Sequence, residues 1–152
     1  MNFNNFTIKS QEAVQEAVNL VQSRGQQAIE PEHLMAGLLK VGENVTNFIF
    51  QKLGINGQQI ETVLDRQITS LPKVSGGEAY LSRSANEVLQ KAVEVSKELG
   101  DEYVSLEALL LALLLVLTMI LSGCSLIVKD EAVDAARALP SDGWLQRLNE
   151  GE

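Results

Sequence analysis

The sequence predicts an all-α fold made of two pseudo-symmetric four-helix repeats that pack together. Residues 6–39 recur at residues 81–114 without a gap, and nine of the 34 aligned positions are identical. Apolar residues recur at helical spacing within both copies, and no segment alternates with the period of a strand. A repeat at a fixed offset indicates that each copy is one unit burying its apolar face against the other. The identical pairs are Glu12/Glu87, Gln15/Gln90, Ala17/Ala92, Val18/Val93, Gly25/Gly100, Glu32/Glu107, Leu34/Leu109, Leu38/Leu113 and Leu39/Leu114.

The composition is that of one globular, acidic domain. The chain has 152 residues, 45% of them hydrophobic, and a formal charge of −8. This charge argues against a nucleic-acid partner, which requires a basic surface. The single cysteine, Cys124, excludes a disulfide within the chain. The N-terminus lacks the basic and apolar run of a secretory signal, so we expect a cytoplasmic protein.

Repeat one, residues 1–70, is predicted to begin with a helix capped by Thr7 and ended by Gly25. A second helix is expected to start at Pro31, because proline suits the first helical turn. Its buried side comprises Leu34, Met35, Leu38 and Leu39.

A third helix is expected over Val45–Leu53, followed by Gly54, and a fourth is expected after a cap at Asn56. Residues 71–80 contain a proline and a Gly-Gly pair and are predicted to be the linker between the repeats.

Repeat two, residues 81–139, follows the same logic, with helix caps at Ser82 and Ser105 and a stop at Gly100. After Leu114 the repeat pattern breaks down. A further helix is predicted over Lys129–Leu139, and residues 140–152 form a polar tail.

The stretch Ala108–Val128 holds 21 residues without a charge. A run of this length is compatible with a membrane span, and Leu121-Ser-Gly-Cys124 resembles a lipoprotein cleavage box. The alternative is therefore a membrane-associated or lipidated protein in which residues 108–128 insert into a bilayer. Against it, a lipoprotein signal belongs at the N-terminus.

No catalytic residue, cofactor or metal is expected. The sequence contains neither the GxxxxGK[ST] phosphate loop nor the GxSxG nucleophile elbow. The only histidine, His33, lies in the first turn of a predicted helix, where a packing or helix-terminal role is expected. One histidine and one cysteine do not make a zinc site.

The sequences EPEHLMAGLL and LGDEYVSLEALLLALL, the duplication and the linker resemble the N-terminal domain of the Clp-type AAA+ chaperones. The chain is most like the disaggregase ClpB and is related to ClpC, and the resemblance covers residues 1 to about 114. It implies a non-catalytic domain with the two-repeat fold. Such a domain captures unfolded or aggregated polypeptide, or an adaptor protein, and passes it to an ATP-driven AAA+ ring.

The resemblance also implies which residues contact clients, and each has a structural alternative. Hydroxyls at Thr7 and Ser82 would also serve as helix caps. First-turn acids would also serve the helix dipole. The apolar groove residues would also serve as core. In ClpC-type relatives the acids matching Glu32 and Glu107 help bind phosphoarginine, but Ala108 replaces the histidine often found beside the second acid. The implied contacts are Thr7, Ser82, Asp101, Glu32 and Glu107, with Val14, Leu89 and Val93 in an apolar groove between the repeats.

Overall fold

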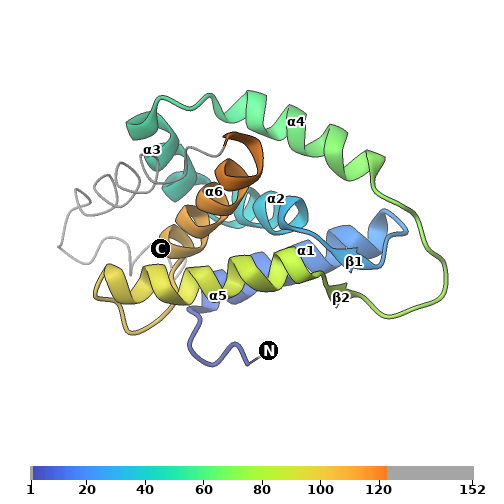
Figure 1. Ribbon diagram of the computed structural model, residues 1–152, viewed down its shortest axis with the longest axis horizontal. Coiled ribbons are helices and arrows are strands. Elements are labelled where there is room, and N and C mark those ends of the chain that lie inside the picture. The colour runs from blue at the N-terminus through green and yellow to red at the C-terminus, as the bar shows by residue number, and fades with distance from the viewer. Residues whose placement is uncertain (1, 123–152) are drawn as a thin grey trace.

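A computed structural model describes residues 2–122, which form six α-helices and two short strands (Figure 1). The all-α class is confirmed. The two strands were not predicted, because a two-residue strand is too short to show an alternating pattern. The helices are α1 (Ile8–Ser23), α2 (Pro31–Val41), α3 (Glu43–Leu53), α4 (Gly57–Ser70), α5 (Arg83–Glu98) and α6 (Leu106–Ser122), and the strands are β1 (Ala28–Ile29) and β2 (Tyr80–Leu81).

Local chemistry defines the ends of α1 and α5 in the same way. The Thr7 hydroxyl accepts a hydrogen bond from the Ser10 amide at 3.2 Å, and the Ser82 hydroxyl accepts one from the Ala85 amide at 3.1 Å. These bonds satisfy amides that have no partner within the helix. Gly25 and Gly100 follow the helices with φ of 67° and 79°, a conformation that glycine adopts without strain. The predicted caps and stops of both helices are confirmed.

The repeats meet at a seam made of two short backbone pairings. Ile29 pairs in parallel with Leu81, and Phe6 forms a parallel bridge with Val104. Adding the repeat offset of 75 residues to Phe6 and Ile29 gives Leu81 and Val104, so the two pairings are pseudo-symmetric. In Figure 1, β1 and β2 lie side by side where repeat one meets the start of repeat two.

The same symmetry places the two helix caps. The Thr7 amide donates to the Val104 carbonyl, and the Ser82 amide donates to the Ile29 carbonyl, both at 3.0 Å. Each helix N-terminus of one repeat is therefore held against the loop that precedes the second helix of the other repeat.

The first part of the uncharged stretch Ala108–Val128 lies in α6 and belongs to the core. All residues from Ala108 to Leu115 are buried, and α6 packs on α5 and α2. The helix continues without a break beyond Leu114 to Ser122. Among residues 2–122, the helices do not reach the length and apolarity that crossing a membrane requires. The predicted helix Lys129–Leu139, the tail 140–152 and Cys124 lie outside the described residues.

The repeat boundaries remain a prediction. The described part of repeat one has the four expected helices, and that of repeat two has α5 and α6. The predicted linker runs over the segment between α4 and β2, although Tyr80 at its end already belongs to β2.

Candidate functional site

The polar residues predicted to contact clients lie along the seam in two groups. Thr7 bonds to Val104, which lies three residues from both Asp101 and Glu107 along the chain. Ser82 bonds to Ile29, which lies three residues from Glu32. Each group thus combines a helix N-terminus of one repeat with a first-turn acid of the other.

The two hydroxyls are already engaged. Thr7 Oγ1 also donates to Ser10 Oγ at 2.9 Å. Ser82 Oγ donates to Glu30 Oε2 at 2.8 Å and so links the two repeats through side chains. Thr7 and Ser82 are thus helix caps, the structural alternative to their predicted role as client contacts. Both side chains remain partly exposed.

Glu107 is the most unusual acid of the site. Its side chain is only 2% exposed, and its Oε2 atom has no hydrogen-bond partner among residues 2–122. Burial raises the pKa of Glu107, and the nearby Asp101 raises it further, while its own backbone amide and the Ser105 hydroxyl oppose the shift. Asp101 itself is exposed in the turn after Gly100, and partial desolvation raises its pKa. The two acids therefore interact electrostatically at one end of the seam.

The corresponding residues of repeat one, Gln26 and His33, are joined in a hydrogen-bond network. The Glu30 amide donates to His33 Nδ1 at 3.0 Å, so His33 Nε2 carries the proton and donates to Gln26 Oε1 at 2.8 Å. Gln26 Nε2 donates in turn to the Ile68 carbonyl at 2.6 Å. Burial lowers the pKa of His33. At the matching positions repeat two has Asp101 and Ala108, so this network has no counterpart there.

The apolar candidates lie mainly in the core. Leu89 is completely buried, Val14 is 8% exposed and Val93 is partly buried against the same cluster. Leu89 is therefore a core residue, which was the structural alternative to its predicted role in the groove. A client cannot reach its side chain unless α5 moves, so its proposed place in a surface groove does not fit this structure.

Different apolar residues are exposed at the seam. Ile8, Tyr80 and Tyr103 are 70%, 56% and 49% exposed, and each lies within two residues of a backbone pairing. Helical periodicity does not reveal these residues, because it detects buried stripes. One feature of the sequence could have indicated that Ile8 is exposed: it directly follows the Thr7 cap and lies outside the apolar stripe of α1.

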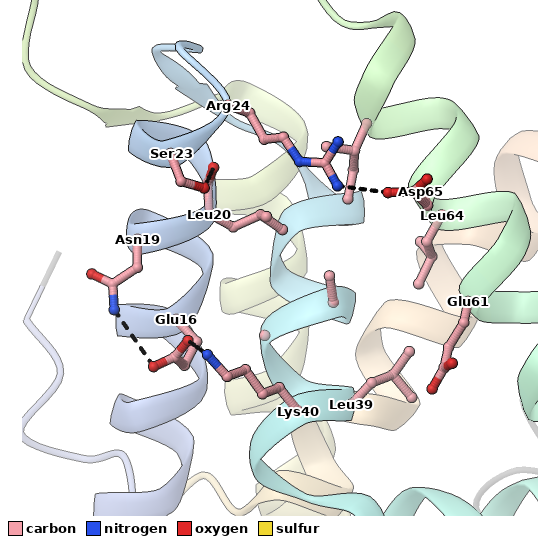
Figure 2. Close-up of a pocket in the computed structure, with 13 residues that line it drawn as sticks. Glu16, Asn19, Leu20, Ser23, Arg24, Leu39, Lys40, Glu61, Leu64 and Asp65 are labelled. Carbon is pink, nitrogen blue, oxygen red and sulfur yellow. Dashed lines mark hydrogen bonds and ion pairs between the residues drawn. The ribbon is translucent and has the colours of Figure 1, made fainter.

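Away from the seam, a cavity of about 580 Å³ lies between α1, α2 and α4 (Figure 2). None of the predicted site residues lines it. Within residues 2–122 no group of three or more metal-ligating side chains occurs.

These features define a helical domain built from two repeats, and comparison with known proteins identifies its class. The profile of the Clp repeat (R) N-terminal domain matches residues 5–121. The chain therefore belongs to the Clp repeat N-terminal domain family. The match continues past Leu114, further than the sequence analysis expected.

Within that class the chain resembles ClpB. It is 74% identical over 130 residues to the chaperone protein ClpB of Bacteroides thetaiotaomicron, which covers 86% of this chain and 15% of that protein. It is 53% identical over 114 residues to ClpB of Porphyromonas gingivalis, covering 75% of this chain and 13% of that protein. The chain thus spans about one seventh of the length of these relatives.

Solved structures share the fold. The Hsp104 N-terminal domain of Candida albicans matches with a TM-score of 0.66 at 21% identity, covering 88% of this chain and 87% of that chain. A complex of the ClpV N-domain with a VipB peptide matches with a TM-score of 0.67 at 16% identity, covering 96% and 89%.

Proposed function

We propose that this chain is the substrate- or adaptor-binding module of an ATP-dependent, ClpB-like disaggregase of the cytoplasm. The module captures unfolded or aggregated polypeptide, or an adaptor protein, and presents it to the AAA+ ring of the parent chaperone. The module itself performs no chemistry.

The observation that carries this proposal is the set of exposed apolar side chains beside the two seam pairings. Five large hydrophobic side chains are exposed among the described residues, and three of them, Ile8, Tyr80 and Tyr103, flank the seam pairings. Misfolded chains differ from folded ones in their exposed apolar segments, and burying such segments against these side chains provides weak, sequence-tolerant binding.

Two further observations support it. The chain is 74% identical to a ClpB chaperone over 130 residues. The ClpV N-domain, which has the same fold, has been solved in complex with a VipB peptide. A polar rim of Thr7, Ser82, Asp101 and Glu32 belongs to the same proposal: we assign client contacts to these four residues, whose acids favour clients with basic residues. Glu107, only 2% exposed, lies beneath this rim, so a client reaches it only if the packing around it opens.

The test measures binding of a dye-labelled, reduced and carboxymethylated polypeptide that cannot fold, with its native form as the control ligand. Ile8→Ser and Tyr103→Ser should each weaken binding by about 1 kcal/mol, or about fivefold, because each removes a partly exposed apolar contact. Val74→Ser is the matched control, since Val74 is 48% exposed in the linker segment. Equal binding by all three variants would exclude the seam as the client site.

Asp101→Asn separates the rim from the apolar contacts. Asp101 is exposed, so the substitution leaves the fold intact. It should weaken a lysine-rich client and leave a neutral client unaffected. The same small effect on both clients would show that the acid has no role in recognition.

A further inference from the structure

Repeat one has a second surface hollow that the seam does not explain. The cavity of about 580 Å³ between α1, α2 and α4 adjoins another of about 540 Å³ between α2, α3 and α4. The two share Leu39, Lys40 and Glu61 in their linings. We call this continuous surface the α2–α4 trough.

The trough is open because α4 is attached mainly at its C-terminal end. Only Leu64 and Ile68 of α4 are buried. The Ile68 carbonyl accepts from the buried Gln26 side chain, and Asp65 forms an ion pair with Arg24 at 2.6 Å. Figure 2 shows this ion pair joining α1 to α4 at one end of the cavity. Toward the N-terminal end of α4, Gly57, Gln58 and Glu61 line the second of the two cavities.

The floor of the trough is apolar and incompletely covered. Leu20 and Leu39 are only partly buried, and Figure 2 shows both extending with Leu64 into the space between the helices. At the matching position of repeat two, Leu114, the counterpart of Leu39, is only 7% exposed.

The charges around the trough are unbalanced. Its two cations are already paired, Lys40 with Glu16 and Arg24 with Asp65. Glu43 and Glu61 also line it, and among residues 2–122 neither forms an ion pair. The trough therefore presents an apolar floor beside two carboxylates without an ion-pair partner among residues 2–122, in a chain whose formal charge is −8.

We propose that the α2–α4 trough is a second peptide-binding site, separate from the seam, for a polypeptide segment that carries an apolar side chain next to a lysine or arginine. The apolar side chain lies between Leu39 and Leu64, and the cation meets Glu61. Charge complementarity selects this occupant, since an acidic segment would be repelled and a purely apolar one would leave the carboxylates unpaired. This inference rests on the proposed function, because it adds a site to a polypeptide-capturing module.

The probe is a dye-labelled peptide in which leucines alternate with lysines, and its control has glutamate at every lysine position. Both are titrated into the whole chain, and binding is followed by fluorescence anisotropy. The lysine peptide should bind, and the glutamate peptide should bind at least tenfold more weakly. Raising the ionic strength from about 0.01 M to about 1 M should remove most of this difference, because the Debye length falls from about 30 Å to about 3 Å.

Two charge reversals localise the site. Glu61→Lys should weaken the lysine peptide about three- to tenfold. Glu78→Lys makes the same charge change in the exposed linker segment and should leave the affinity within about twofold. Equal loss in both variants would mean that net charge, and not the trough, controls binding.

Amide chemical shifts of the ¹⁵N-labelled chain distinguish this proposal from the seam. Binding in the trough should move the signals of Leu39, Glu61 and Leu64 at the lowest peptide concentrations. Shifts confined to Ile8 and Tyr103 would overturn the trough and leave the proposed function standing. Failure of both this peptide and the unfolded polypeptide to bind would overturn both.

Discussion

Replacing Gly37 with alanine tests how closely α1 and α2 approach. A Cβ atom at Gly37 would lie 2.3 Å from the Ala13 carbonyl oxygen and 3.0 Å from the Ala17 amide nitrogen. Both are backbone atoms of α1, so no side-chain rotation relieves the contact. The helices must separate by about 1 Å to restore ordinary contact.

The expected cost follows from two opposing effects. Overpacking a core contact costs about 1–3 kcal/mol, and the rigid backbone places this case at the upper end. Alanine is a better helix former than glycine by about 1 kcal/mol. Gly37→Ala should therefore lower the free energy of unfolding by about 2 kcal/mol, which lowers Tm by about 4–8 °C for a domain of this size.

Thermal and urea unfolding followed by circular dichroism provide the assay. Gly57→Ala is the matched control in the same repeat, because its Cβ would meet only the Phe50 ring at 3.4 Å. This variant should unfold within about 2 °C of the wild type. If Gly37→Ala unfolds at or above the wild-type temperature, the reasoning about the α1–α2 contact is refuted.

Further substitutions test three buried residues. Because burial lowers the pKa of His33 below its usual 6.5, the unfolded chain takes up the proton first, and the contribution of His33 to stability should fall as the pH drops below 6.5. His33→Gln should therefore lose less stability over this range in pH-dependent urea titrations, and identical slopes would contradict this. Because the pKa of Glu107 is raised above 4.5, the contribution of Glu107 to stability should fall as the pH rises from 4.5 through the folded-state value, so Glu107→Gln should gain stability relative to the wild type toward neutral pH, and parallel stability curves would exclude a buried charge. Leu89→Asp places a charge in a fully buried site, so it should lower the free energy of unfolding by about 3 kcal/mol or more and abolish cooperative unfolding. Val93→Asp, at a partly buried site, should keep the far-UV circular dichroism signal of the wild type. Cooperative unfolding of the Leu89→Asp variant would support the original placement of Leu89 in a surface groove.

The seam residues show where sequence reasoning succeeds and where it stops. Thr7 and Ser82 were predicted as caps because capping depends on the four residues that follow. Glu107 was interpreted as an acid at a helix N-terminus, and its burial was missed. That burial depends on how α6 packs in the folded domain, which no local pattern records.

The apolar residues show the same limit. Periodicity correctly predicted that Leu34, Met35 and Leu38 are buried in α2, since helical spacing alone determines which residues share a face. It also predicted that Leu39 is buried. The structure leaves Leu39 half-open, because α4 contacts α2 mainly near Leu64 and Ile68.

The sequence by itself determined the duplication, the helical class, the helix caps and the kinship with the Clp repeat domain, because each depends on residues close together in the chain or on a fixed offset. Only the tertiary structure decided the seam pairings, the burial of Glu107, the exposure of Ile8 and Tyr103, and the α2–α4 trough. These depend on contacts between segments far apart in sequence, where the packing of whole helices decides which side chains are covered and which remain available to a partner.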